Sequence, residues 1–165
     1  MEFRELIAEI GRTRDPRIAL DAIRAEHGRG TSRWIANTFG VNPRTARKYL
    51  AGEINPGRAG SQRRQAVLAS ASPAFVAAQR LRRARRLVVG SVRVRYLDRD
   101  EGSRDVGTLS VDSDLADKLN EAADLLEEGD LDAAEDALSG AILDAYGDLA
   151  DTLTISDYEN GLGIY

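Results

Sequence analysis

Apolar side chains recur every three or four positions through the first half of the chain, a spacing that places them on one face of an α-helix. In residues 2–10 this face consists of Phe3, Leu6, Ile7 and Ile10. Glycines and prolines interrupt the pattern repeatedly, so the region divides into short helices. The predicted helices cover residues 2–10, 16–26, 31–39, 43–51, 62–70 and 73–86, with a glycine-rich loop at 52–61.

Beyond residue 86 apolar and polar positions alternate and β-branched residues become frequent, which is typical of strands. In order, we expect a strand at 87–97, a charged turn at 98–105, a strand at 106–111, a helix from Asp112 or Ser113 to Gly129, a helix at 131–146 and a strand at 152–158. The pattern predicts an α+β protein. A helical part at residues 1–86 precedes a small strand-and-helix part at residues 87–165.

The net charge of −4 hides a strong asymmetry along the chain. Residues 1–104 contain 22 of the 23 basic residues and 10 of the 27 acidic ones, a net charge of +12. Residues 105–165 contain one basic and 17 acidic residues, a net charge of −16. A strongly basic segment indicates a polyanionic partner, most commonly nucleic acid, whereas an acidic segment suits dimerisation or protein partners.

The segment from Thr31 to Leu50 has the spacing of a helix-turn-helix. Two helices that cross steeply need a small residue inside the first helix, which Ala36 supplies. The turn needs a residue that tolerates a positive backbone angle, which Gly40 supplies. Thr31 or Ser32 can cap the first helix, and the residues expected beneath the turn and in the core are Ile35, Val41, Ala46 and Leu50.

The second helix of this motif is a candidate recognition helix. Asn42 can cap it and Pro43 suits its first position. In the major groove, Arg44 or Arg47 can bind guanine with two hydrogen bonds, and Thr45 can contact a thymine methyl group or a phosphate. The residues expected to contact DNA here are Arg33, Asn42, Arg44, Thr45, Arg47 and Lys48, with Arg33 on the phosphate backbone. The alternative is a structural helix pair with a solvated basic face.

A second basic stretch follows at residues 80–86, where five of seven residues are arginine. We expect these side chains to follow phosphates beside the groove, which would make binding steeply salt-dependent. The alternatives are a solvated face or contacts with the acidic C-terminal part. The candidate phosphate-binding residues are Arg63, Arg64, Arg80, Arg82, Arg83, Arg85 and Arg86.

Two segments carry a resemblance to a known family. They are residues 35–50, with Ala36, Gly40 and Arg44 among the matches, and residues 108–119, which begin Thr-Leu-Ser-Val. Over roughly residues 30–160 the chain resembles the telomere terminal proteins of linear actinomycete replicons, the Tpg-type family, or a related helix-turn-helix protein of a mobile element.

The resemblance implies a role as protein primer in the replication of linear DNA ends. In that family a side-chain hydroxyl is joined to the first nucleotide of the 5′ end, and the protein remains attached to the telomere. Thr108 matches the linking threonine, at the start of a strand that leads into a helix. A replication protein would then be a partner.

Two other functions remain open from the sequence. The first is a transcriptional regulator of a plasmid, phage or chromosome, which binds as a dimer. The strand-helix-helix order of residues 108–146 is similar to a ribbon-helix-helix dimer, in which strands of two chains pair. The second is an architectural or partition protein with little sequence preference.

We expect a homodimer held by residues 87–165. The strands predicted there offer free edges, and the two helices carry more leucine and isoleucine than so small a part can bury alone. This leucine stripe consists of Leu115, Leu119, Leu126, Leu138, Ile142 and Leu143.

Several kinds of chemistry are not expected. The chain has no cysteine and one histidine, His27, which we expect at a helix end rather than as a metal ligand. The glycine-rich stretches lack the strand-loop-helix context of a phosphate loop. We therefore expect no metal, no cofactor and no enzymatic activity.

The N-terminus lacks the apolar region of a secretion signal, and no apolar run reaches the length of about 20 residues that crosses a bilayer. A cytoplasmic, nucleoid-associated protein without membrane contact is expected.

Overall fold

All the predicted helices are present in the computed structural model, which describes residues 1–53, 58–97, 99–147 and 153–165. The elements are α1 (Phe3–Ile10), α2 (Pro16–His27), a 3₁₀ turn (Gly28–Gly30), α3 (Thr31–Phe39), α4 (Pro43–Leu50), α5 (Arg58–Ala69), α6 (Pro73–Arg82), β1 (Arg86–Tyr96), β2 (Arg99–Ser110), α7 (Ser113–Glu128), α8 (Leu131–Tyr146), β3 (Thr154–Tyr158) and β4 (Gly163–Ile164). The α+β class is confirmed. Within the described ranges, no helix is long and apolar enough to cross a membrane.

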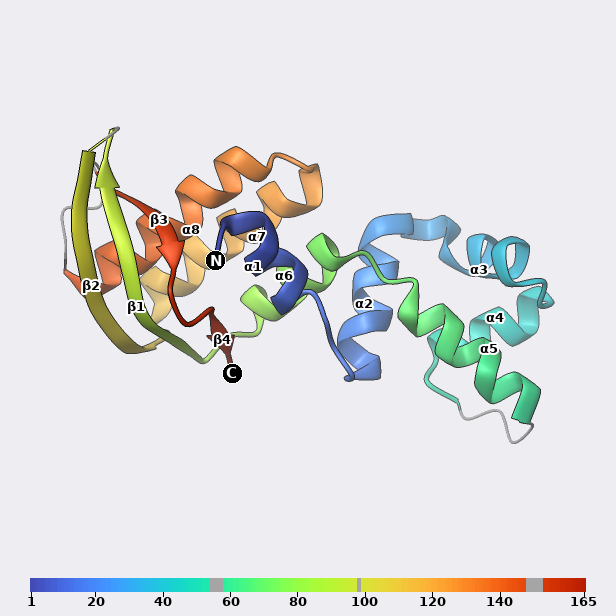
Figure 1. Ribbon diagram of the computed structural model, residues 1–165. Coiled ribbons are helices and arrows are strands. Elements are labelled where there is room, and N and C mark those ends of the chain that lie inside the picture. Colours follow the sequence, from blue (N-terminus) through green and yellow to red (C-terminus); the bar gives the residue numbers. More distant parts are fainter. Residues whose placement is uncertain (54–57, 98, 148–152) are drawn as a thin grey trace.

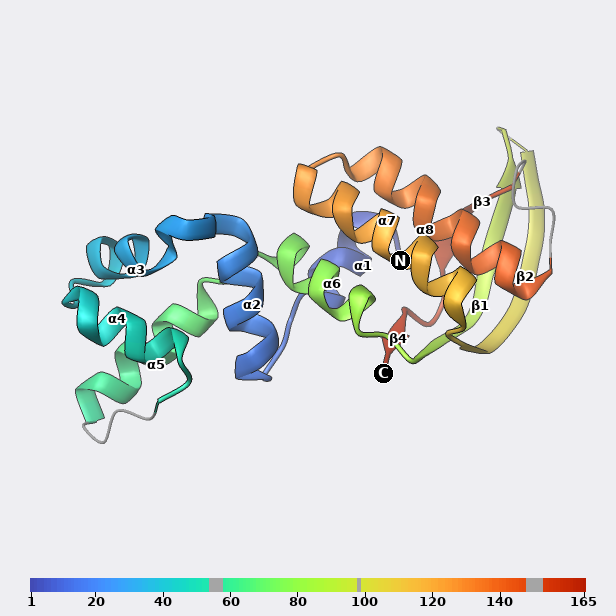
Figure 2. The same ribbon diagram turned by 180° about the vertical axis from the view of Figure 1, so that it is seen from behind.

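The elements form two lobes, which lie at opposite ends of the molecule in Figures 1 and 2. The helical lobe consists of α2–α5, and its core contains Ile23, Ile35, Ala36, Ala46, Tyr49 and Val67. The sheet lobe consists of the sheet, α7, α8, α1 and α6, which share one larger core.

The boundary expected near residue 87 does not coincide with the boundary between these two cores. Phe3 and Ile10 of α1, with Leu81 of α6, are buried in the core of the sheet lobe. A Cβ atom at Gly11 would lie 2.5 Å from the carbonyl oxygen of Pro73, so α1 ends directly against the start of α6. The apolar face of an amphipathic helix shows that the helix is partly buried, but it does not identify the element that covers this face. The sequence therefore did not reveal that α1 packs in the sheet lobe.

The helix ends follow local hydrogen bonding. Asn42 and Asp112 cap α4 and α7 as expected, because their Oδ1 atoms accept from the N–H groups of Thr45 and Leu115 at 2.8 and 2.9 Å. The cap expected from Thr31 or Ser32 is wrong. The 3₁₀ turn precedes α3, and the Thr31 hydroxyl donates to the carbonyl of Gly28 at 2.6 Å.

Two other helix limits differ from the prediction. The first residue of α5 is Arg58 rather than Gln62, and residues 54–57 of the predicted loop lie outside the described residues. The last residue of α6 is Arg82 rather than Arg86. It ends there because the N–H groups of Arg85 and Arg86 donate to the carbonyl of Tyr165, at 2.6 and 2.9 Å, where β1 starts to pair.

The sheet is antiparallel, with the order β2-β1-β3, and β4 pairs with the start of β1. The charged turn expected over residues 98–105 is wrong over residues 99–105, because β2 begins at Arg99 and pairs with β1, and residue 98 lies outside the described residues. Tyr96 pairs with Arg99, and Leu97 has a positive φ of 53°. The strand β4 was not predicted, because two residues carry no alternating pattern.

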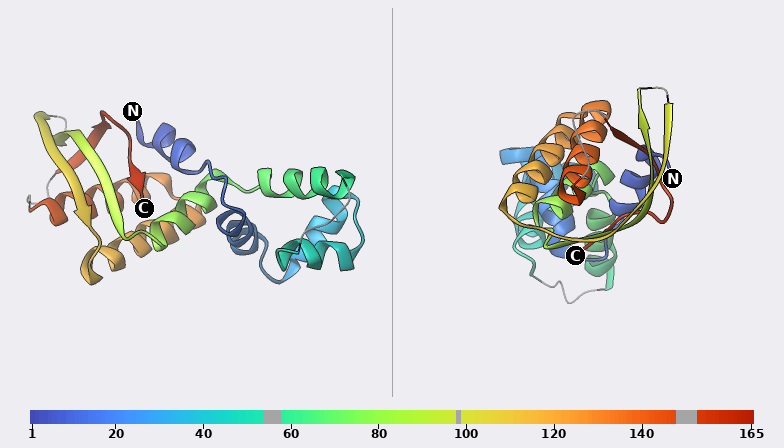
Figure 3. Two further views of the ribbon diagram at one scale, coloured as in Figure 1. Left: turned by 90° about the horizontal axis from the view of Figure 1, so that it is seen from below. Right: turned by 90° about the vertical axis from the view of Figure 1, so that its left-hand side faces the viewer.

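Helices α7 and α8 lie on one face of the sheet (Figure 3). All six residues of the leucine stripe are buried, with exposed fractions of 0–3%. The expectation that a second chain must cover them is wrong, because α1, α6 and the sheet cover them within one chain. The similarity to a ribbon-helix-helix dimer is also wrong, since β2 pairs with β1 of its own chain.

Candidate nucleic-acid interface

The turn between α3 and α4 has the geometry that the sequence predicted. Gly40 adopts the left-handed conformation, with φ 63° and ψ 36°. The N–H group of Val41 donates to the carbonyl of Ala36 at 3.2 Å, which closes the end of α3. Ala36 is 8% exposed, so the small side chain lies within the core where the helices meet.

One face of α4 is fixed against the core of the helical lobe. Ala46 and Tyr49, three positions apart, are 0% and 1% exposed. Leu50, the residue expected in the core, is only half-buried, whereas Tyr49 was not predicted. The spacing from Ala46 to Tyr49 was the available indication, but a tyrosine next to Lys48 reads equally well as part of an exposed face.

The opposite face of α4 carries its positive charge. Arg44 and Lys48 are four positions apart and about half a turn away from Ala46, so they project outward on one line. Arg47 and Thr45 lie on the two flanks of that line. Arg44, Arg47 and Lys48 are exposed, with no hydrogen bond or ion pair to another described residue, and Thr45 is half-buried.

The first helix of the motif is held by ring contacts. His27 ends α2, as expected, and stacks on Trp34 of α3 with 3.7 Å between ring centroids. Trp34 meets Phe39 edge to face at 5.8 Å. These contacts fix α3 against α2 and leave Arg33 exposed next to Trp34.

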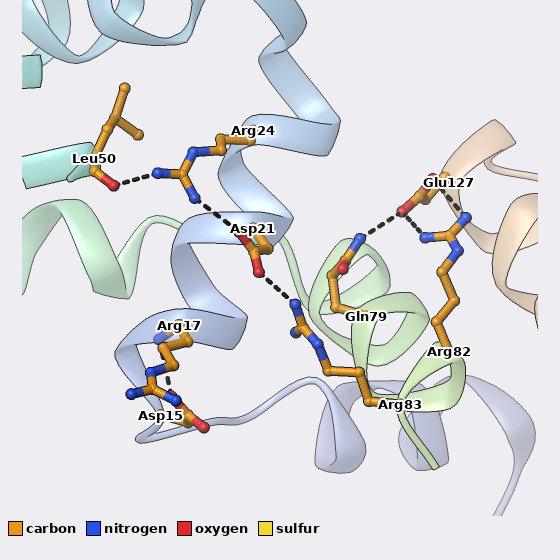
Figure 4. A network of polar contacts seen from close by, with 9 residues as sticks. All are labelled: Asp15, Arg17, Asp21, Arg24, Leu50, Gln79, Arg82, Arg83 and Glu127. Atoms are coloured by element: carbon orange, nitrogen blue, oxygen red, sulfur yellow. Dashed lines mark hydrogen bonds and ion pairs between the residues drawn. The ribbon is translucent and has the colours of Figure 1, made fainter. Parts of the chain in front are cut away.

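Arg24 holds the far end of α4, a contact that the sequence did not reveal. Its guanidinium donates to the carbonyl oxygen of Leu50 and, at 2.8 Å, to Oδ1 of Asp21 (Figure 4). The last carbonyls of a helix lack partners within the helix, so an arginine on α2 satisfies one of them. Position and orientation of α4 therefore depend on α2.

The second basic stretch is largely used inside the protein. Arg80 donates to the carbonyls of Ile10 and Ile164, at 2.8 and 3.3 Å. Arg82 contacts Glu127 and Asp124 of α7, and the hydrogen bond to Glu127 raises the pKa of its guanidinium. Arg82 therefore contacts the acidic C-terminal part, which is one of the alternatives that the sequence left open.

The other candidate phosphate ligands differ in accessibility. Arg83 pairs with Asp21, and Arg86 lies over the ring of Tyr165 with 5.2 Å to its centroid. Arg85 is exposed. On α5, Arg63 is exposed, whereas Arg64 is half-buried and its Nε atom has no partner among the described residues. Arg63 is therefore the more accessible of this pair.

Thr108 lies in the sheet lobe, far from α4 (Figures 1 and 2). It is exposed, pairs with Val88 and stands near the end of β2, not at the start of a strand as expected. A cavity of about 370 Å³ lies beside it, and its charged lining residues are Asp112, Asp114 and Asp144 with one lysine, Lys118. These carboxylates repel a nucleotide phosphate unless cations accompany it. Within the described residues, no group of side chains forms a metal site.

No protein-family model, no curated protein and no solved structure matches the chain.

Proposed function

We propose that the protein binds double-stranded DNA by placing α4 in the major groove. The observation that carries the proposal is the division of α4 into a face fixed by Ala46 and Tyr49 and an opposite face with Arg44 and Lys48. A helix held in this way presents its outward side chains, above all those near its N-terminus, to base edges.

Electrostatics support this orientation. Residues 16–69, from α2 to the end of α5, contain ten basic and three acidic residues, a net charge of +7. Such a charge attracts the DNA backbone at long range, and the attraction weakens as salt rises. Ten of the 27 acidic residues of the chain lie on α7 and α8, in the other lobe.

The geometry of α4 gives its side chains separate roles. Arg44 and Lys48 on the central line are the base-contacting residues, and both suit the O6 and N7 atoms of guanine. Arg47 and Thr45 on the flanks meet the phosphates that border the groove, together with Arg33 of α3. Asn42 acts first as the cap that fixes the start of α4.

Anisotropy titration of two labelled duplexes, a site selected from a random pool and a random-sequence duplex, tests the proposal. We expect Arg44→Ala with Lys48→Ala to cost about 1–3 kcal/mol for each lost base contact on selected sites. The matched control is Arg4→Ala with Arg99→Ala, which removes two exposed arginines of the sheet lobe and the same charge. Equal losses in both variants would show that only overall charge matters.

The same titration separates the regulator from an architectural protein. A transcriptional regulator discriminates strongly between a selected site and random duplex, whereas an architectural or partition protein binds both alike. We propose sequence recognition, because α4 offers side chains with base-specific geometry. The protein would act without enzymatic activity, in the cytoplasm and in association with the nucleoid.

We also propose that two copies pair through the sheet lobe. In the described sheet β2 has a neighbour on one side only, so its other edge is available to a second β2. Sedimentation must use the full chain, because α1 and α6 complete the core of this lobe. A monomer at tens of micromolar in moderate salt would exclude the dimer. We expect high salt to strengthen the dimer, since it screens the acidic surfaces, and to weaken DNA binding.

A second candidate function is that of a telomere terminal protein, with a replication protein as partner. The supporting observation is that Thr108 is an exposed residue in the lining of a cavity. The test is the mass of the protein purified from its native host after nuclease treatment. An added nucleotide that is absent from Thr108→Val supports this role, and an unmodified mass excludes it.

A further inference from the structure

Two neighbouring arginines at the end of α6 reach toward opposite lobes. Arg82 extends to Glu127 on α7, and Arg83 extends to Asp21 on α2 (Figure 4). Their helix belongs to the core of the sheet lobe, so Arg82 makes a contact within that lobe and Arg83 makes a contact between the lobes.

The Arg82 side is firmly held. Its guanidinium bonds both oxygens of Glu127, with 3.0 Å between Nη2 and Oε2, and it also contacts Asp124. Gln79 donates to Glu127 from the preceding turn of α6, at 3.3 Å. A bidentate pair of this kind restricts the orientation of the guanidinium and the carboxylate as well as the distance between them. The end of α6 is therefore fixed relative to α7.

The Arg83 side continues into the recognition helix. Asp21 accepts from Arg83 with Oδ2 and from Arg24 with Oδ1, and Arg24 donates in turn to the carbonyl oxygen of Leu50, the last residue of α4. We call this set of contacts, Arg83, Asp21, Arg24 and the Leu50 carbonyl, the interlobe network. It forms an unbroken polar path from the sheet lobe to the end of α4 (Figure 4).

Two chain segments and helix packing also join the lobes. The chain passes between them twice, at residues 11–15 and 70–72, and the lobes meet where α2 packs against α6. The side chains of Arg83 and Asp21 are 44% and 34% exposed, so salt has access to the ion pair. Exposed pairs contribute little to folding stability, but a shared carboxylate can still select one orientation among several of similar energy.

We propose that Asp21 is a positioning residue that fixes the orientation of α4 relative to the sheet lobe, and that salt releases this constraint. A carboxylate has two acceptor oxygens, and each oxygen of Asp21 accepts from one of the two arginines. Asparagine in the same orientation would accept from one arginine and turn its N–H groups toward the other. The consequence for DNA rests on the proposed function, whereas the orientation itself is measured without DNA.

The chain has no cysteine, so two introduced cysteines can be labelled selectively. Spin labels at Asn37→Cys on α3 and Ser110→Cys at the end of β2, both exposed positions, report the separation of the lobes. At low salt we expect a narrow distance distribution in the parent and a broad one in Asp21→Asn and in Arg83→Gln. The double variant should be no broader than either single variant, because both remove the same contact. At about 1 M salt, where the Debye length is about 3 Å, the parent should resemble Asp21→Asn.

The control is Asp124→Asn, which removes a partner of the neighbouring Arg82 and the same charge but lies within the sheet lobe. Its distribution should match the parent. Emission from Trp34, the single tryptophan, shows whether the helical lobe remains folded. If Asp21→Asn unfolds that lobe, Arg83→Gln, which leaves the Asp21–Arg24 contact intact, decides the question. A parent-like distribution in folded Arg83→Gln, or equal broadening in Asp124→Asn, would overturn the proposal, whatever the outcome of DNA binding.

Discussion

The two basic stretches of the chain contain similar residues and have different surroundings. On α4, Arg44, Arg47 and Lys48 project away from a core that Ala46 and Tyr49 fix. At the end of α6, Arg80 binds backbone carbonyls and Arg82 binds carboxylates of α7. An arginine with intramolecular partners must give them up to reach DNA, so the two stretches are not equivalent as binding surfaces.

The density of arginines along a sequence indicates a binding surface only together with the exposure of their side chains. The helical lobe has a small core and few acidic side chains, and its arginines on α4 remain available. The sheet lobe has a larger core and most of the acidic residues, which lie close enough to α6 to pair with its arginines. Changes in the first stretch should affect binding, and changes in the second should affect folding.

The largest expected effect concerns the core beneath α4. Tyr49→Ala removes a fully buried aromatic ring from a small core, which costs about 3–5 kcal/mol of unfolding free energy in comparable substitutions. Urea unfolding followed by Trp34 emission measures it. Tyr96→Ala, at an exposed tyrosine of β1, should stay within about 0.5 kcal/mol of the parent. A small loss in Tyr49→Ala would contradict the assignment of the buried face of α4.

The next effect separates the two basic stretches. Arg82→Ala leaves Glu127 without its main partner and should cost about 1–2 kcal/mol of unfolding free energy. The neighbouring exposed Arg85→Ala should change stability by less than about 0.5 kcal/mol. DNA affinity at fixed salt should not fall specifically in folded Arg82→Ala. A fall in affinity without a loss of stability would return Arg82 to the DNA-binding surface.

A smaller effect compares the helix caps of the two lobes. Asn42→Ala and Asp112→Ala should each cost about 1 kcal/mol, because each removes the acceptor for a backbone N–H at the start of a helix. Trp34 emission should report the loss in Asn42→Ala, which lies in the helical lobe. In Asp112→Ala the loss should appear in far-ultraviolet circular dichroism. Equal responses of Trp34 in both variants would show that the lobes unfold as one unit.

The smallest effect is a pH dependence in the sheet lobe. Burial raises the pKa of Glu135 above its ordinary value, so the folded state binds this proton more tightly than the unfolded state. Stability from this group is present below the unfolded pKa and is lost as pH rises through the folded pKa. We expect Glu135→Gln to raise the Tm slightly at neutral pH and to reduce its dependence on pH. A Tm that is lower at neutral pH than in the parent would contradict this assignment.

Much of the fold follows from local patterns, and its assembly does not. Apolar spacing identified the helices. Gly40 marked the turn and Asn42 marked the start of α4, because both residues act on backbone groups close to them in the sequence. The buried state of the leucine stripe and the partners of Arg82 depend on contacts between segments distant in sequence. For the same reason the Arg24 contact with the Leu50 carbonyl, which joins α2 to α4, had no indication in the sequence.

The central claim is that α4 reads base sequence in the major groove. Repeated selection of bound duplexes from a random pool tests it directly, with the parent protein and Arg44→Ala compared at one salt concentration. We expect an enriched site with guanine at defined positions, and we expect Arg44→Ala to lose the preference at one of those positions and to keep the others. No enrichment by the parent protein, or the same enriched site in folded Arg44→Ala, would contradict the account.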